Sequence, residues 1–383
     1  MINKLKIKKK IRVAIIQRRI APFRIPFFEK INKRGNIEIT VFYAVNSHIQ
    51  SAKFSTRRYK IKKIRIFSSN LEIGYCLFFS LMKERYDVVV FEGAISLITS
   101  IIHIILLRLL FWKKVCLWSS GWEPFGTSKI KKVARNVLYF VICHISNNII
   151  AYSSKAKKYF ESLKKKPAKI FVAFNVLDTD SYLESEGAIN LAEVLLLKKN
   201  LNIEGKKVLL FVGKIEPKKK VPLLLEAYKI MIKNNWINKI ALIIVGDGSE
   251  KKRLEDLVKR ELLPNVHLIG EIRNPVEIAI YFKAADLFVL PGAGGLAIYH
   301  AMIFGLPVVL SSADGTEGDL VINEETGFYF KDNSADDLAG KLSFILTKRD
   351  AYIKMLGGNA RYKALKDFSI EKMVKGFQDA ILS

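Results

Sequence analysis

The chain has 383 residues, half of them hydrophobic, which is enough for two domains with their own cores. Its three cysteines, Cys76, Cys116 and Cys143, have no paired spacing, which excludes a disulfide framework or a zinc site and favours a reducing cytoplasm. The net charge of +27 is unevenly divided: residues 1–180 hold 35 Lys and Arg against 10 Asp and Glu, whereas residues 181–383 hold 28 against 26.

The basic N-terminal half predicts an anionic partner, either nucleic acid or anionic lipid, with a solvated basic face as the alternative. Its apolar runs at 76–82, 94–107 and 137–145 favour lipid, although each is shorter than the roughly 20 residues of a spanning helix. Basic residues lie near them at Lys113, Lys114, Lys129, Lys131, Lys132 and Arg135. We expect binding to an anionic membrane surface and no nucleic acid; helices buried wholly in the core are the alternative.

Short strands alternate with helical stretches along the chain. In the N-terminal half we predict strands at 11–16, 37–43, 87–91, 114–118, 148–152 and 169–174, then a polar junction at 175–200. The second half has predicted strands at 208–212, 241–245, 266–269, 287–290 and 307–310, and a terminal helix at 368–382. The pattern is typical of α/β domains with parallel sheets, here over 1–185 and 200–365, with the terminal helix over 366–383.

Glycine and lysine stand where the first strand of the second half ends. Gly213 permits a tight turn after 208–212, and Lys214 and Lys219 follow it. Ligands of open α/β sheets bind beyond the carboxyl ends of the strands, and lysine is a mobile point charge suited to phosphate. These residues predict a diphosphate site, with an ordinary solvated loop as the alternative.

Gly246, Asp247 and Gly248 form a second turn, between the strand at 241–245 and a helix that starts near Glu250. The glycines permit a close turn, but the pattern is shorter than a complete dinucleotide-binding fingerprint. Taken alone, this turn is more typical of an ordinary strand-to-helix connection.

A glycine-rich turn with Gly292, Gly294 and Gly295 leads into a helix that begins near Leu296. The first amides of a helix lack intrahelical partners and lie at the positive end of its dipole, so such a turn can hold an anion. His300 lies further along the helix and is either a ligand contact or a packed or exposed helix residue. Together, the three turns predict a nucleotide site.

The order and spacing of these turns resemble the donor-nucleotide domain of glycosyltransferase family four, which has the GT-B fold of two Rossmann-like domains. The resemblance rests on Phe-Val-Gly-Lys at 211–214 with Lys219, Val-Gly-Asp-Gly at 245–248, and Ala-Asp-Leu-Phe-Val-Leu-Pro at 285–291. It continues through His-Ala-Met at 300–302 into Gly-Leu-Pro-Val-Val at 305–309 and covers residues 207–330. It implies a terminal helix that crosses back to the N-terminal domain.

Two departures from the family pattern concern charged groups. The paired glutamates of the family, which contact the donor sugar and the ribose, are replaced by Gly292 and His300, and its usual arginine by Lys214. His300 is a candidate for catalysis and for a hydroxyl contact, and the Gly292 backbone for a sugar contact. Some members carry Pro-Gly-x-x-Gly-Leu-Ala followed by His-Ala, so the resemblance implies a divergent active subgroup. Glu317 is a further donor-side candidate, or else an exposed loop acid.

In the N-terminal half the resemblance points to segments that follow two strands, at the cleft of such a fold. Arg24 stands in an Arg-x-Pro-Phe-Phe opening and is expected to face donor phosphate or acceptor. Trp118, Gly121, Trp122 and Glu123 are expected on the acceptor side. Glu123 is the candidate for binding or deprotonating an acceptor hydroxyl, with a structural loop role as the alternative.

The resemblance implies a transferase that moves a sugar from a nucleotide-diphosphate sugar to a glycan or lipid-linked glycan, with retention of configuration and no cofactor or essential metal. The expected setting is bacterial surface polysaccharide biosynthesis, in the cytoplasm and peripherally at the inner face of the cell membrane. Two alternatives stay open: a nucleotide-sugar epimerase on the same fold, and a non-catalytic nucleotide-sugar-binding partner.

Overall fold

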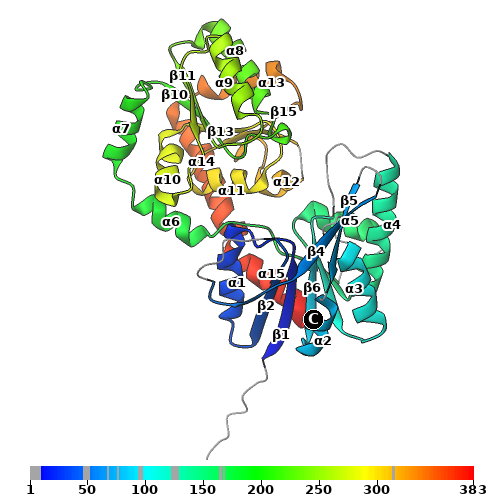
Figure 1. The fold of residues 1–383 in the computed structure, drawn as a ribbon. Helices are drawn as coiled ribbons and strands as arrows, with labels where there is room; N and C mark the ends of the chain where they lie inside the picture. The colour runs from blue at the N-terminus through cyan, green and yellow to red at the C-terminus, as the bar shows by residue number, and fades with distance from the viewer. Residues whose placement is uncertain are drawn as a thin grey trace, which may run out of the picture. The chain divides into compact units, whose positions relative to one another are not determined.

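The computed structural model describes residues 10–45, 52–66, 69–75, 77–93, 98–121, 129–163, 166, 169–312 and 315–383. The chain divides into two compact units, Met1–Asn175 with Ile370–Ser383, and Val176–Ser369 (Figure 1). The polar segment expected as a junction belongs to the second unit and includes helices α6 (Thr179–Gly187) and α7 (Leu191–Asn200). Within the described ranges, no helix is both long enough and apolar enough to cross a membrane.

A parallel sheet of seven strands, in the order β3-β2-β1-β6-β7-β8-β9, forms the centre of the first unit. Its strands are β1 (Ile11–Gln17), β2 (Ile37–Tyr43), β3 (Ser55–Arg58), β6 (Val88–Glu92), β7 (Lys114–Ser119), β8 (Asn148–Ala151) and β9 (Ile170–Val172). The six strands predicted in this half are confirmed. The polar edge strand β3 and the antiparallel hairpin of β4 (Lys60–Ile66) and β5 (Ser69–Tyr75) are additional to the prediction.

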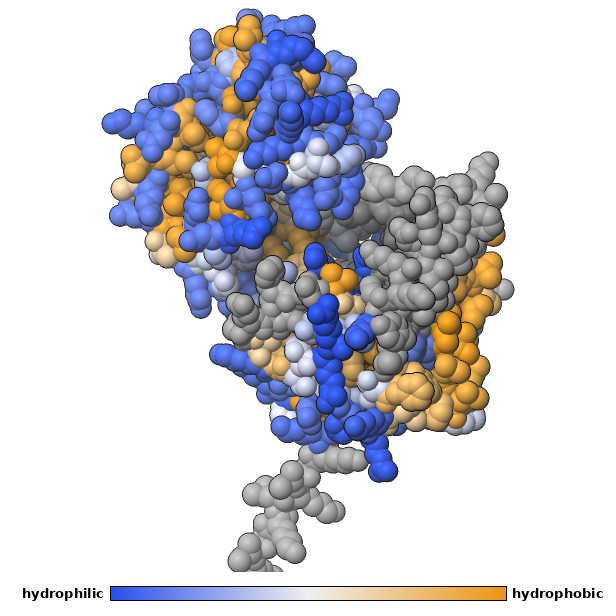
Figure 2. Space-filling model, in the orientation of Figure 1, coloured by the Kyte–Doolittle hydropathy of each residue, from blue (hydrophilic) through white to orange (hydrophobic). Residues whose placement is uncertain are grey.

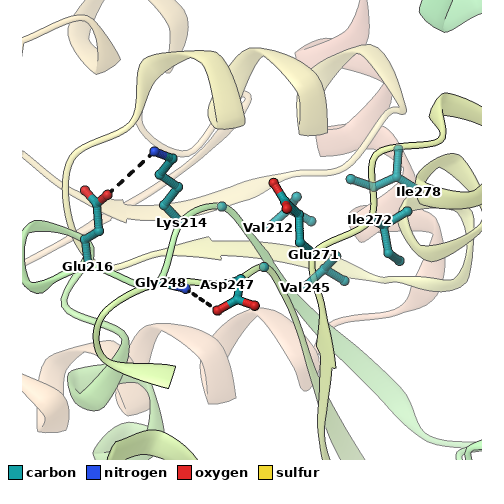
Figure 3. A pocket seen from close by; sticks show the side chains of 11 residues that line it. Val212, Lys214, Glu216, Val245, Asp247, Gly248, Glu271, Ile272 and Ile278 are labelled. Carbon is teal, nitrogen blue, oxygen red and sulfur yellow. Dashed lines mark hydrogen bonds and ion pairs between the residues drawn. The ribbon is translucent and has the colours of Figure 1, made fainter. Parts of the chain in front are cut away.

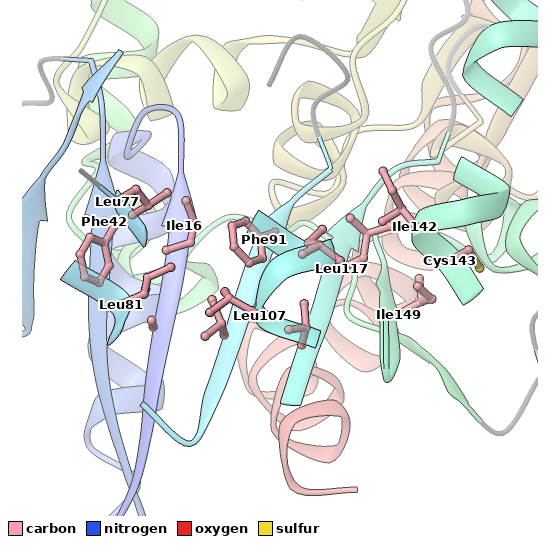
Figure 4. Close-up of a cluster of buried hydrophobic side chains, with 14 of the residues drawn as sticks. Ile16, Phe42, Leu77, Leu81, Phe91, Leu107, Leu117, Ile142, Cys143 and Ile149 are labelled. Atoms are coloured by element: carbon pink, nitrogen blue, oxygen red, sulfur yellow. The ribbon is translucent and has the colours of Figure 1, made fainter. Parts of the chain in front are cut away.

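Helices cover both faces of this sheet, which explains why its central strands are apolar on both sides. On one face α1 (Ile25–Asn32) packs against α15 (Ile370–Leu382), and the ring centroid of Phe377 lies 5.2 Å from those of Phe27 and Trp118. The other face carries α2 (Leu77–Lys83), α3 (Ile98–Leu109), α4 (Lys129–Ile145) and α5 (Ser154–Ser162). Their buried side chains form one core with those of the central strands (Figure 4).

The terminal helix α15 belongs to the first unit, as the resemblance implied. The Asn148 side chain at the start of β8 donates a hydrogen bond of 2.7 Å to the Ala380 carbonyl. Glu371, in the first turn of α15, pairs with Lys30 at 3.0 Å and with Arg34 at 2.7 Å. Apolar packing and these polar contacts therefore hold the last helix against strands and helices from the beginning of the chain.

The second unit has a parallel sheet of six strands in the order β12-β11-β10-β13-β14-β15. They are β10 (Lys207–Val212), β11 (Ile240–Val245), β12 (Val266–Gly270), β13 (Leu287–Leu290), β14 (Val308–Ser311) and β15 (Gly327–Phe330). Its further helices are α8 (Val221–Met231), α9 (Lys251–Arg260), α10 (Pro275–Ala284), α11 (Gly295–Ile303), α12 (Glu317–Leu320), α13 (Ala335–Leu346) and α14 (Asp350–Asp367). The five predicted strands and the α/β class are confirmed. The strand order reverses beside β10, where open α/β sheets bind ligands.

Candidate active site

A pocket of about 370 Å³ lies at the carboxyl ends of β10, β11 and β12 (Figure 3). Its lining residues are Val212, Gly213, Lys214, Glu216, Val245, Gly246, Asp247, Gly248, Glu271, Ile272 and Ile278. The structure thus brings together the predicted donor-side residues Gly213, Lys214, Gly246, Asp247 and Gly248, whereas Lys219 does not line this pocket. Glu271 and Ile272 were not predicted, although their position directly after β12 was the available signal.

Charged side chains stand at the rim of this pocket. The Lys214 ammonium lies 3.8 Å from the Glu216 carboxylate, and the Lys214 side chain is 76% exposed (Figure 3). Glu216 also pairs with Lys218 at 3.1 Å, and this hydrogen bond lowers the pKa of Glu216. Because an exposed, loosely held lysine can reorient at little cost, Lys214 is able to turn toward a phosphate group.

The turns after β10 and β11 approach each other backbone to backbone at Gly246. A Cβ at this position would lie 1.9 Å from the carbonyl oxygen of Gly213. The Gly246 amide donates a hydrogen bond of 2.7 Å to the Gly270 carbonyl, and Asp247 accepts one of 2.6 Å from the Gly248 amide. A glycine is required at Gly246, since a backbone carbonyl cannot move aside as a flexible side chain can.

We expect Gly246→Ala to destabilise the protein by about 2 kcal/mol or more and to weaken nucleotide binding, because the new methyl group forces the two turns apart. Denaturant midpoints and the nucleotide-induced shift in Tm measure the two effects. Gly340→Ala is the matched control, since a Cβ on Gly340 in α13 would meet no atom within 4 Å. Equal stability of the two variants would contradict this reading of the loops.

A second cluster lies where the basic loop meets the N-terminus of α11. The Lys219 ammonium donates a hydrogen bond to the Ala293 carbonyl and lies 2.6 Å from the position that a Cβ on Gly294 would take. The first amides of α11, at Gly295 and Leu296, have no acceptor within the helix. An ammonium group and the positive end of a helix therefore meet here, which is the arrangement that an anion favours.

Two further donor-side candidates are held inside these loops. A Cβ on Gly292 would lie 2.2 Å from the Lys218 carbonyl oxygen, so the glycine-rich turn contacts the backbone of the basic loop. Glu317, at the start of α12, is 4% exposed and accepts hydrogen bonds from the Gly315 amide at 2.6 Å and the Ser312 hydroxyl at 3.2 Å. Glu317 is therefore a buried acid that closes its own loop, neither an exposed loop acid nor a lining residue of the pocket.

His300 is packed in the core of the second unit. Its ring centroid lies 4.1 Å from that of Tyr182 in α6 and 4.2 Å from that of Phe282 in α10. Burial lowers the pKa of His300 to about 3, so the ring is neutral at ordinary pH. Because α6 and α10 cover its side of α11, the expectation of a catalytic or ribose-binding His300 is corrected to that of a packed helix residue.

The stability of the fold should depend on pH through His300. A histidine in the unfolded chain has a pKa near 6.5, so the unfolded state binds more protons than the folded state between pH ~6.5 and ~3. The contribution of His300 to the free energy of unfolding should therefore be complete above pH ~6.5. As the pH falls below ~6.5, the free energy of unfolding should decrease by at most ~1.4 kcal/mol per pH unit because of this group. His300→Phe should remove this part of the slope. Urea unfolding at several pH values tests the prediction, and equal slopes in the two proteins would contradict it.

In the first unit, Arg24 is buried in a polar cluster. Its guanidinium carbon lies 4.6 Å from the ring centroid of Trp118, and the group donates hydrogen bonds to Glu92 at 3.2 Å and to the Tyr152 hydroxyl at 2.8 Å. Gln17 accepts a further hydrogen bond from it. Burial raises the pKa of Tyr152 to about 12, so the phenol stays neutral. The expectation of a ligand-facing Arg24 is therefore corrected: the guanidinium positions Glu92 and Tyr152.

Glu92 is a partly exposed carboxylate beside Arg24 that was not predicted as a site residue, although it directly follows the strand predicted at 87–91. It ends β6, beside β1, where the strand order of the first sheet reverses, and its side chain is 22% exposed. The Gly121 amide donates to the Ser119 hydroxyl at 3.0 Å. The predicted Trp122 and Glu123 lie outside the described residues. Among the residues that the structure describes, no group of three or more His, Cys, Asp or Glu could hold a metal ion.

Two Rossmann-like units, with glycine-rich turns at the carboxyl edge of the second sheet, define a GT-B protein. The family model described as "Glycosyl transferases group 1" matches residues 195–362. A relative from Escherichia coli, UDP-Gal:alpha-D-GlcNAc-diphosphoundecaprenol alpha-1,3-galactosyltransferase, is 30% identical over 306 residues, which are 78% of this chain and 76% of that protein. The chain therefore belongs to the group 1 glycosyltransferases, which confirms the resemblance drawn from the sequence.

Solved structures support the same fold. Anabaena Alr3699/HepE in complex with UDP has a TM-score of 0.76 and 15% sequence identity, with 97% of this chain and 99% of that chain covered. Its complex with UDP-glucose has a TM-score of 0.71 and 15% identity, with 97% and 98% covered. The two-unit GT-B architecture thus persists at very low sequence identity.

Proposed function

We propose that the protein transfers a sugar, with retention of configuration, from a nucleoside-diphosphate sugar to a glycan or lipid-linked glycan. The observation that carries this proposal is the Lys219 ammonium at the N-terminus of α11, because a cation and free helix amides together favour a diphosphate. The Anabaena complexes with UDP and UDP-glucose support a uridine nucleotide as donor.

In this proposal the pocket beyond β10, β11 and β12 takes the nucleoside. Ile272 and Ile278 offer apolar walls for the base, and Glu271 offers oxygens for the ribose hydroxyls. From these isoleucines toward Lys214 the lining changes from apolar to charged (Figure 3). Such a gradient suits a ligand with a flat base at one end and anionic phosphates at the other.

The chemistry is a substitution at the anomeric carbon. The bond between this carbon and the diphosphate oxygen breaks, the acceptor hydroxyl oxygen bonds to the carbon, and the hydroxyl proton passes to the departing diphosphate. Lys214, Lys219 and the first amides of α11 stabilise the negative charge that develops on the leaving group. Because these groups already supply positive potential, the proposal includes no metal ion and no other cofactor.

The acceptor is proposed to belong to bacterial surface polysaccharide biosynthesis. The Escherichia coli relative is named for a sugar acceptor linked to diphosphoundecaprenol, which supports a lipid-linked glycan. Glu92 accepts a hydrogen bond from Arg24 and lies at the carboxyl end of β6 in the first unit. Its carboxylate is suited to bind an acceptor hydroxyl. The protein would then work in the cytoplasm, peripherally at the inner face of the cell membrane.

The test is product analysis with radiolabelled UDP-sugars, the full chain and a bacterial lipid extract as the source of acceptor. Label that enters the lipid fraction supports transfer, and NMR of the new linkage decides between retention and inversion. Conversion of one UDP-sugar into another without extract would support an epimerase. Donor binding without any product would support the alternative of a non-catalytic nucleotide-sugar-binding partner. The observation that favours this alternative is the replacement of both family glutamates by Gly292 and His300.

A further inference from the structure

Large hydrophobic side chains are exposed at the end of α3. Residues 109–112, the sequence Leu-Leu-Phe-Trp, are all exposed, and Trp112 reaches 80%. Phe79 of α2 is also exposed and touches Phe78, whose ring centroid lies 5.5 Å from that of Phe111. In Figure 2, hydrophobic atoms gather along the edge of the first unit where α3 and α4 lie. Residues 109–112 and Phe79 thus form a continuous apolar surface.

The outer face of α4 extends this surface. Val133, Val137, Phe140 and Val141 are exposed, and their spacing places them on one side of the helix. The opposite side contributes Cys143 and its neighbours to the core, and α3 and α4 contact each other. A helix that is apolar on both sides needs a second apolar environment. We call residues 109–112, Phe79 and this face of α4 the hydrophobic edge.

The net positive charge of the protein comes entirely from the unit that carries the hydrophobic edge. Residues 1–175 and 370–383 hold 37 Lys and Arg against 10 Asp and Glu, whereas residues 176–369 hold 26 against 26. The basic residues include exposed Lys83 and Arg85 at the end of α2, and the first turns of α4 hold Lys129, Lys131, Lys132 and Arg135. An apolar surface on a unit of charge +27 calls for a partner that is both apolar and anionic.

An anionic phospholipid bilayer has both properties. A second copy of the chain would bring two units of like charge together, which is unfavourable. Nucleic acid would match the charge but leave the hydrophobic edge in water. A bilayer takes up apolar side chains at its interface, where Trp is favoured, and each nearby Lys or Arg adds attraction to anionic lipid.

We propose that the hydrophobic edge is the membrane-docking surface of this protein, with Trp112 inserted among the headgroups of an anionic leaflet. The inference rests on the proposed function only for its purpose, which is access to a lipid-linked acceptor. Its physical basis is the exposed apolar side chains and the charge of the first unit.

Vesicle flotation of the full chain tests this surface. We expect binding to vesicles of phosphatidylglycerol and phosphatidylcholine, and at least roughly tenfold weaker binding to phosphatidylcholine alone or at high salt. Trp112→Ser with Val137→Asn should lower binding by roughly tenfold or more, because both side chains lose apolar contact. Leu262→Ser is the control, since Leu262 is as exposed but lies on the second unit, whose net charge is zero. Trp112→Phe should keep binding while losing the lipid-induced blue shift of tryptophan fluorescence.

Circular dichroism checks that the exposed substitutions leave the fold intact. No binding of the wild type to phosphatidylglycerol vesicles, or equal binding of the double variant, overturns the proposal. Equal binding to neutral vesicles overturns its electrostatic part. If the wild type forms a dimer and the double variant is monomeric, the hydrophobic edge is instead an interface with a second copy of the chain. Vesicle binding without any nucleotide-induced shift in Tm would count against the proposed transferase and leave the docking surface intact.

Discussion

Gly292→Glu should abolish donor binding, although it restores the first carboxylate of the family pattern. A Cβ at this position would lie 2.2 Å from the carbonyl oxygen of Lys218 and 2.9 Å from the Cα of Lys219. Both are backbone atoms of the loop that carries Lys219, so the loop itself must move. We expect a loss of about 2–3 kcal/mol in stability and the disappearance of the UDP-induced rise in Tm.

Gly292→Ala separates the effect of the clash from that of the carboxylate. It should be nearly as damaging, because the Cβ alone makes the forbidden contact. Gly318→Ala serves as the control in the short helix α12, where a Cβ would meet no atom within 4 Å. A Gly292→Glu protein that binds UDP as well as the wild type would show that the two loops are not in contact.

Lys219→Ala should remove most of the increase in Tm that a UDP-sugar produces. The ammonium is held at the N-terminus of α11 by the Ala293 carbonyl, so its loss removes the charge best placed to meet the diphosphate. A charge-assisted contact contributes about 1.5–3 kcal/mol, which corresponds to a roughly tenfold to hundredfold weaker Kd. Titration of UDP, followed by thermal shift, measures this loss because stabilisation grows with ligand occupancy.

The controls for this experiment distinguish the phosphate contact from a general disturbance of the loop. Lys218→Ala removes a neighbouring ammonium that pairs with Glu216, and should change UDP affinity much less. Weak stabilisation by uridine, which has no phosphate, should be the same in Lys219→Ala and wild type. An unchanged UDP response in Lys219→Ala would place the diphosphate elsewhere.

Most of the fold could be predicted because parallel strands covered on both faces are short apolar runs bounded by turns. The strands 11–17 and 240–245 have this character, and so do the other predicted ones. The edge strand β3 is Ser-Thr-Arg-Arg, and β15 is a run of four residues directly after Thr326. The composition of β3 is polar, so only its pairing with β2 makes it a strand. The Phe-Tyr-Phe of β15 does favour a strand, but the run is short and was not predicted.

In the candidate site, too, the features set by local sequence could be predicted, and those set by contacts between distant segments could not. The glycine turns could be predicted because the sequence of one strand-to-helix connection determines each of them. The contact of Lys219 with Ala293 joins loops 74 residues apart, and no spacing reveals it. The side of α11 that carries His300 could not be assigned either, since it depends on where α6 and α10 pack. Arg24 lies in the predicted segment, but its partner Glu92 is 68 residues away.

The path of the last helix has a consequence for how this protein can be dissected. Because the chain enters the second unit at Val176 and leaves it after Ser369, two covalent connections join the units. A fragment that stops at Asn175 would lack Phe377, whose ring fills the space beside Phe27 and Trp118. A chain truncated at Asn175 therefore lacks part of the core of the first unit. To produce the first unit alone, α15 has to be supplied as a fused or separate peptide.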